Sequence, residues 1–207
     1  GAKGAVGVTR NNRIGVIGTS ATISSGAYER TIRSINKANS VFSQRCPLFV
    51  PLVEEGWIDK DVTLEIAGIY LKPLKKENID TLILGCTHYP MLKSVIGKFM
   101  GPKVALVDSA KEVAKEARNI LERIQPDLVH GHFLTNHGFV AARTGFRPLV
   151  VSAWGSDVLL RPQSWFMMRM ILRYVLRVAD LITSDADSMT EVMIDHGANP
   201  RRVVTFR

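Results

Sequence analysis

The sequence has few cysteines and no long apolar run, and these absences exclude several classes of protein. Cys46 and Cys86 are the only cysteines among 207 residues, so a disulfide scaffold is excluded and a reduced, cytoplasmic location is expected. No apolar run reaches the roughly 18 residues of a membrane-spanning helix, and the N-terminus lacks a signal-peptide pattern. The dinucleotide fingerprint G-x-G-x-x-G is also absent. We therefore expect no nicotinamide cofactor, and no other cofactor either.

Lysine is missing from the last two-fifths of the chain. All 11 lysines lie within the first 125 residues, whereas residues 126–207 hold nine arginines and no lysine. The net charge of +8 invites a nucleic-acid interpretation, but the basic residues are scattered and form no recognisable binding motif. A solvated basic surface is the simpler interpretation. The change in composition suggests that the chain has two parents.

Short apolar runs alternate with amphipathic stretches along the whole chain, which predicts alternating strands and helices. The expected strands are Arg13–Ile17, Ser40–Phe42, Thr81–Leu84, Val104–Val107, Leu128–His130, Leu149–Ser152, Leu181–Ser184 and Val203–Phe206. The expected helices are Ala21–Asn36, Lys60–Lys75, Tyr89–Phe99, Ser109–Arg123, Asn136–Thr144, Ser164–Ala179 and Ser188–His196. Because continuous Val/Ile/Leu strands separated by helices indicate a parallel sheet covered on both faces, the predicted class is α/β.

The helix expected over Ser109–Arg123 lies where the composition changes. Ser109 is the predicted N-cap, and Glu112 completes a capping box three residues later. Its apolar residues recur at helical spacing, which predicts a crossover helix buried on a shared sheet. These residues are Val113, Ala117, Ile120, Leu121 and Ile124.

Cys86 ends a predicted strand, with His88 two positions later at the start of a helix. A thiolate at a helix N-terminus beside an imidazole is expected to have a lowered pKa and to move a proton. The surrounding segments resemble bacterial glutamate racemase from the first residues to about residue 120. The segments that carry this resemblance are Ile14–Thr19, Ser25–Tyr28, Cys46–Trp57, Ile79–Pro90 and Val107–Ala110.

The racemase resemblance implies roles for four residues. That family uses two cysteines that face each other across the α-carbon of the substrate, and Cys86 matches the second of them. Thr87 matches a substrate contact, while His88 and Glu54 match an assisting acid/base pair. The first cysteine of the family, in a C-N-T sequence, and its Asp-Ser-Gly-rich loop do not occur in these 207 residues. Because inversion requires two opposed bases, we expect no useful racemase activity.

Residues from about 125 to 207 resemble a different family. Gln125–His132, Arg147–Asp157, Ala179–Ser184 and Asn199–Val204 are similar to the N-terminal domain of family 4 glycosyltransferases. By this resemblance the polar residues that follow the strands line a substrate cleft, namely His130, His132, Gly155 and Asp157. The two histidines and Asp157 raise the question of a metal site. Since neither H-E-x-x-H nor C-x-x-C spacing accompanies them, we expect no metal.

These observations predict one α/β domain over residues 1–207, built from a racemase-like fragment, 1–124, and a glycosyltransferase-like fragment, 125–207. The expected architecture is a single doubly wound, Rossmann- or flavodoxin-like, mostly parallel sheet. We expect an engineered or recombined chimaera that is not an enzyme and needs no partner. One alternative is a residual racemase-like site that binds glutamate, or exchanges its α-proton, through Cys86. The other is a basic module that binds anions or nucleic acid; a homodimer through an edge strand is a further possibility.

Overall fold

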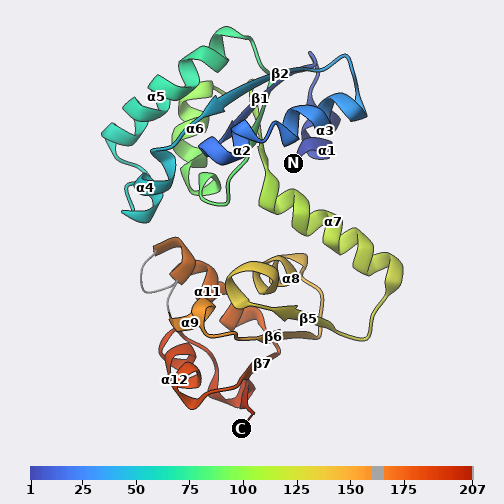
Figure 1. Ribbon diagram of the computed structural model, residues 1–207, viewed down its shortest axis with the longest axis vertical. Coiled ribbons are helices and arrows are strands. Elements are labelled where there is room, and N and C mark those ends of the chain that lie inside the picture. Colours follow the sequence, from blue (N-terminus) through green and yellow to red (C-terminus); the bar gives the residue numbers. More distant parts are fainter. Residues whose placement is uncertain (160–165, 207) are drawn as a thin grey trace. The chain divides into compact units, whose positions relative to one another are not determined.

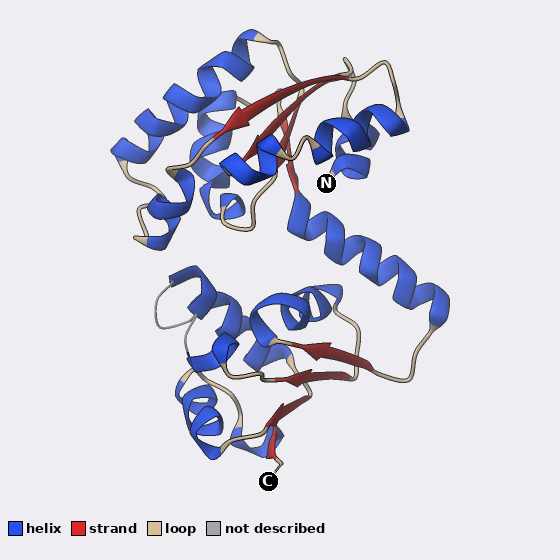
Figure 2. Cartoon of the chain, in the orientation of Figure 1, coloured by secondary structure: helices blue, strands red, loops and turns tan. Residues whose placement is uncertain are grey.

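The computed structural model describes residues 1–159 and 166–206, and these divide into two compact units, Gly1–Glu112 and Val113–Arg207. All eight expected strands are present, and the α/β class with parallel sheets flanked by helices is confirmed (Figure 2). The prediction of one continuous sheet was wrong, because the strands form two four-stranded sheets. Among the described residues, no helix is long and apolar enough to cross a membrane.

Unit 1 is a parallel sheet with strand order β2-β1-β3-β4. Because the chain moves from β1 outward to β2 and then back across β1 to β3, right-handed connections place helices on both faces. Figure 1 shows α5 and α6 on one side of this sheet and α1 and α3 on the other. The elements are α1 (Ala2–Val8), β1 (Arg13–Gly18), α2 (Ser20–Ser24), α3 (Ala27–Ile35), β2 (Ser40–Arg45), α4 (Phe49–Glu54), α5 (Asp61–Lys76), β3 (Thr81–Leu84), η1 (Tyr89–Leu92), α6 (Lys93–Met100) and β4 (Ala105–Asp108).

The centre of unit 1 is formed by β1 and β3, whose residues are almost all buried. Their Ile, Val and Leu side chains form the two-sided core that a covered parallel sheet requires. The helix expected over Ala21–Asn36 is instead divided into α2 and α3. Gly26 causes the break, because its φ of +61° is a left-handed conformation that a glycine adopts without strain.

The helix α7 (Ser109–Ile124) spans the boundary between the units, and its apolar stripe is not buried as expected. Val113, Ile120 and Ile124 are 51%, 41% and 63% exposed. The physical reason is that, among the described strands, β4 pairs only with β3 and β5 only with β6, so α7 does not cross one shared sheet. Its N-terminus also differs from the prediction, since Asp108, not Ser109, accepts hydrogen bonds from the first-turn amides of Ala110 and Lys111.

Unit 2 is a parallel sheet with consecutive strand order β5-β6-β7-β8. Burial alternates along β6 and β7, so one face is packed and the other is not. This pattern follows from the strand order, because right-handed connections between strands that advance in one direction place every helix on the same face. The elements after α7 are β5 (Val129–His132), η2 (Leu134–Gly138), α8 (Phe139–Thr144), β6 (Leu149–Ser152), α9 (Ser156–Leu159), α11 (Phe166–Val178), β7 (Leu181–Ser184), α12 (Asp187–Asp195), η3 (Pro200–Arg202) and β8 (Val203–Thr205).

The packed face of unit 2 forms one core. Val151 and Ile182 of the sheet lie in the same cluster as Leu172 and Val175 of α11 and Met193 of α12. The expected start of a helix at Ser164 lies outside the described residues.

Candidate active site

The candidate site of unit 1 lies at the carboxyl end of β3, where parallel sheets commonly bind ligands. Gly85 follows the strand, and an added Cβ there would lie 2.7 Å from the carbonyl oxygen of Ile17. The glycine therefore lets the backbone leave β3 close to β1, which places Cys86 beside the ends of both central strands.

Cys86 is half-buried, and burial raises the pKa of its thiol. Backbone N–H groups of His88, Tyr89 and Thr87 point at the sulfur and lower that pKa, but they do not outweigh the burial. The sequence-based prediction of a lowered pKa was therefore wrong, because the strand end lies deeper in the protein than the motif alone indicates.

His88 joins Cys86 to Glu54. Its Nδ1 atom lies 3.7 Å from Cys86 Sγ and 3.4 Å from Thr87 Oγ1, and its Nε2 atom contacts Glu54 Oε1. The side chains of His88 and Glu54 are only 8% and 16% exposed. When Nε2–H donates to the carboxylate, Nδ1 carries the lone pair and faces the thiol. This arrangement suits transfer of a proton from sulfur to nitrogen.

Packing around Tyr89 holds Glu54 near His88, although 34 residues separate them in the sequence. The hydroxyl of Tyr89 donates to the carbonyl of Cys46 at 2.9 Å, and its ring lies edge-on to Phe49 with centroids 5.3 Å apart. Since Phe49 begins α4 and Glu54 ends it, this aromatic contact places the carboxylate beside the imidazole.

Cys46 does not belong to this group of reactive side chains. It is fully buried, its Sγ lies 3.8 Å from the carbonyl oxygen of Gln44, and burial raises its pKa far above the ordinary thiol range. A thiol that stays protonated in an apolar setting is a packing residue.

Sequence reasoning missed a second polar group, at the end of β4. Asp108 is 8% exposed and pairs with Lys93 Nζ at 2.8 Å, while Ser109 Oγ and Tyr28 OH are 2.8 Å apart. Burial acts to raise the pKa of Asp108, but Lys93 and the amides of Lys111 and Ala110 outweigh it and hold the pKa below its usual value. An aspartate directly before a helix is a recognisable N-cap, and this signal was available in the sequence.

The polar residues predicted in unit 2 form a separate set of contacts. The centroids of the His130 and His132 rings are 4.1 Å apart and the ring planes are tilted by 35°, and His130 Nε2 lies 2.7 Å from Ser152 Oγ. Asp157 is fully buried and accepts hydrogen bonds from the amides of Leu134 and Trp154, at 2.6 and 3.0 Å. Asp157 therefore supports two turns.

Gly155 has a left-handed φ of +89°, which places it in the turn that Asp157 supports. Within residues 1–159 and 166–206, no group of three or more His, Cys, Asp or Glu side chains is arranged to hold a metal ion. The roles that the second resemblance implies for His130, His132, Gly155 and Asp157 stay predictions.

An α/β unit that places a thiol beside an imidazole–carboxylate pair has the groups needed to move protons. The family model for Asp/Glu/Hydantoin racemase matches residues 3–117, and a model for Glycosyl transferase 4-like proteins matches residues 107–186. The chain therefore belongs to the Asp/Glu/Hydantoin racemase family. Both expected resemblances are confirmed.

Individual relatives agree with this family. Glutamate racemase from Geobacter metallireducens is 49% identical over 144 residues, which cover 68% of this chain and 52% of that protein. A glutamate racemase isoform from Bacillus anthracis superposes with a TM-score of 0.60 and 36% identity, covering 74% of this chain and 61% of that one.

The glutamate racemase from Francisella tularensis, whose structure contains D-glutamate, gives a TM-score of 0.54 and 37% identity. The superposition covers 60% of this chain and 47% of that one. The chain spans about half the length of the relatives that it matches.

These comparisons correct two expectations. The prediction of an inactive chimaera without native catalytic function was wrong, because the chain belongs to a racemase family and the relatives that it matches are named glutamate racemase. The prediction that the chain is not an enzyme was wrong for the same reason. An engineered origin is likewise not supported. The absence of a partner cysteine does not establish inactivity, because Cys86 still lies beside His88, which contacts Glu54.

Proposed function

We propose that unit 1 binds glutamate and exchanges its α-proton through Cys86. The observation that carries this proposal is the Cys86 thiol beside His88, whose far nitrogen is held by Glu54. The relatives named glutamate racemase, and the D-glutamate in one solved relative, support glutamate as the substrate.

The chemistry needs only groups that unit 1 contains. Nδ1 of His88 takes the proton of Cys86, which leaves a thiolate facing the backbone amides that follow it. The thiolate then removes the α-proton of glutamate, and the electron pair of the broken C–H bond stays on the substrate as a carbanion conjugated with its carboxylate. Return of a solvent-exchanged proton from the same sulfur restores glutamate with its configuration retained.

The test is incubation with L- and D-glutamate in heavy water, followed by proton NMR of the α-position. We expect deuterium uptake with retention, and loss of uptake in Cys86→Ala. Cys46→Ala is the matched control, because it removes the other, buried thiol and should leave exchange unchanged. Equal uptake by the two variants would contradict the proposal.

Glu54 is proposed as a positioning residue that acts through His88. Glu54→Gln keeps the size of the side chain but removes the charge that stabilises a protonated imidazole. We expect exchange to slow by about 10- to 100-fold, as for loss of a partner that orients a functional histidine. The pH dependence of the rate should also move, which a purely structural role would not produce. An unchanged pH profile would argue against this role.

A further inference from the structure

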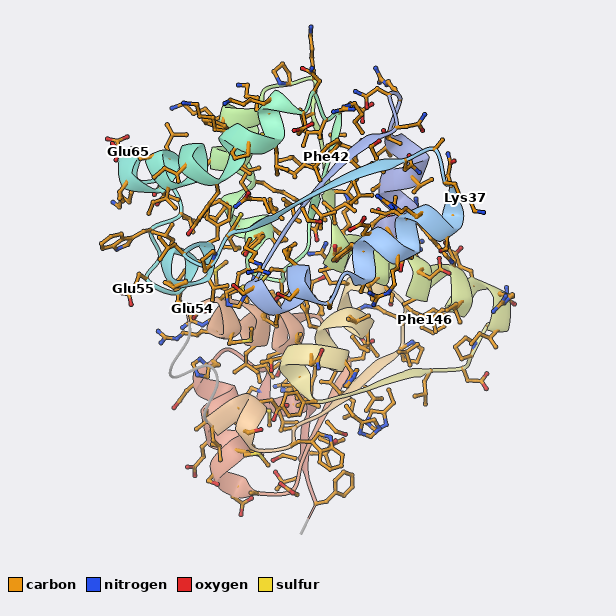
Figure 3. All side chains as sticks on the ribbon, turned by 45° about the horizontal axis from the view of Figure 1, so that its top comes forward. Lys37, Phe42, Glu54, Glu55, Glu65 and Phe146 are labelled. Atoms are coloured by element: carbon orange, nitrogen blue, oxygen red, sulfur yellow. The ribbon has the colours of Figure 1, made fainter. Side chains whose placement is uncertain are left out.

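The apolar stripe of α7 is a surface that the candidate active site does not use. Val113, Ala117, Ile120 and Ile124 follow one another at intervals of four, three and four residues, so they form one line along the helix. Ala117 is half-buried and the other three are exposed. Glu54, which Figure 3 labels on α4, belongs to the separate candidate active site. A line of large exposed apolar side chains marks an interaction surface.

The two edges of this stripe differ in polarity. One edge carries Glu116 and Arg123, which are exposed and have opposite charges. The other edge carries Ala114, which is buried, and Leu121, which is half-buried. The chain itself therefore covers the apolar edge, whereas the stripe and its charged edge face outward.

The charges of α7 indicate what kind of partner fits the stripe. The helix holds four basic and three acidic side chains. Helices that lie on anionic membranes, and those that bind nucleic acid, present a predominantly basic polar face. A near balance of charges beside an apolar line is instead typical of a helix that packs against another helix.

A second copy of the same helix has a matching surface when the two helices run antiparallel. If Ala117 lies opposite Ile120 of the second copy, Val113 lies opposite Ile124 of that copy, and two-fold symmetry repeats both contacts. The line then forms four consecutive apolar layers, and the small Ala117 meets the larger Ile120 in the two central ones.

The same alignment also matches the charges. Glu116 lies beside Arg123 of the second copy, offset by about 3 Å along the helix axis at the helical rise of about 1.5 Å per residue. Long side chains span that offset, and symmetry supplies the pair twice. In a parallel arrangement Glu116 would instead face Leu121 of the second copy. The charges therefore favour the antiparallel arrangement.

We propose that two copies of this chain associate through α7, as an antiparallel helix pair whose seam is the line from Val113 to Ile124. The 16 residues of α7 extend over about 24 Å. A contact of this length is smaller than the roughly 800 Å² per partner of a standard interface. The dimer is therefore weak and reversible.

Sedimentation velocity of the full chain, over concentrations from about 10 µM to about 1 mM, measures this association. Ile120→Gln places a polar side chain in the seam and should abolish the dimer. Asn119→Gln is the matched control, because it introduces the same residue at the exposed neighbouring position outside the stripe. A chain that stays monomeric throughout, or a dimer that Ile120→Gln leaves intact, would overturn the proposal.

Exchange of the charges tests the antiparallel alignment. Glu116→Arg and Arg123→Glu each turn both attractive pairs into like-charge contacts, so each should weaken self-association by about tenfold. An equimolar mixture of the two variants restores opposite charges at both positions and should dimerise as the unmodified chain does. Lys115→Glu changes the net charge as Arg123→Glu does, but at an exposed position outside the seam, and should dimerise normally.

NMR spectra of each variant verify that its fold is unchanged before association is compared. A mixture of Glu116→Arg and Arg123→Glu that associates no better than either variant alone would contradict the proposed alignment. Equal weakening by Lys115→Glu and Arg123→Glu would show that net charge, and not the seam, governs association. Because the stripe does not include Cys86, these outcomes do not depend on glutamate exchange.

Discussion

Substitution of Gly85 by alanine tests whether the backbone at the end of β3 must lie close to the carbonyl group of Ile17 in β1. The new Cβ would lie 2.7 Å from the carbonyl oxygen of Ile17 and 3.1 Å from Cε2 of Tyr28. The same carbonyl accepts the amide of Gly85 at 2.8 Å, so moving away would lengthen that hydrogen bond. Overpacking of this kind costs about 1–3 kcal/mol, and weakening one hydrogen bond adds about 1 kcal/mol.

We therefore expect Gly85→Ala to lower the free energy of unfolding of unit 1 by about 2–4 kcal/mol. Hydrogen exchange of the buried amides of β1 and β3 measures this change. The control is Gly97→Ala in α6, where the nearest side-chain atom, of Leu106, lies 3.7 Å away. An alanine inside a helix should stabilise by about 0.5–1 kcal/mol. A loss below about 0.5 kcal/mol for Gly85→Ala would refute the close-approach argument, since surface substitutions change stability by that amount.

Three further predictions concern charged and titratable groups. Asp157→Asn should destabilise unit 2 by about 1–3 kcal/mol, because an amide has one acceptor oxygen and cannot accept both backbone hydrogen bonds as a carboxylate does. Urea unfolding measures this loss, with Asp185→Asn, a change at an exposed residue, as the control. The lowered pKa of Asp108 stabilises the fold above the ordinary carboxyl value of 3.8, and this contribution is lost as the pH falls through the lowered pKa. In acid titrations, the free energy of unfolding of Asp108→Asn should therefore depend less on pH below pH 4 than that of the unmodified chain. Since burial raises the pKa of Cys86 above its ordinary value of 9.0, the rate at which iodoacetamide alkylates this thiol should still be rising with pH at that value, and a plateau near neutrality would contradict this.

The sequence predicted the strands well, because buried parallel strands are recognisable as continuous Val/Ile/Leu runs, as in Thr81–Leu84. The sequence did not predict that these strands form two separate sheets. The pairing of β4 depends on contacts between distant residues, which local periodicity does not contain, and α7 has the amphipathic pattern of a crossover helix although its stripe is exposed.

The candidate site shows the same division. The resemblance brought Cys86, His88 and Glu54 together, and the structure places them in contact. The predicted direction of the pKa shift of Cys86 was wrong, because that shift depends on how deeply surrounding side chains bury the thiol.

The most direct test of the central claim is the fate of the α-proton of each glutamate enantiomer when the unmodified chain is incubated in heavy water. The account predicts that deuterium enters the α-position of glutamate and that the labelled product keeps its configuration, because one thiol serves one face. Failure of both enantiomers to take up deuterium, in a sample whose fold is verified by NMR, would contradict it.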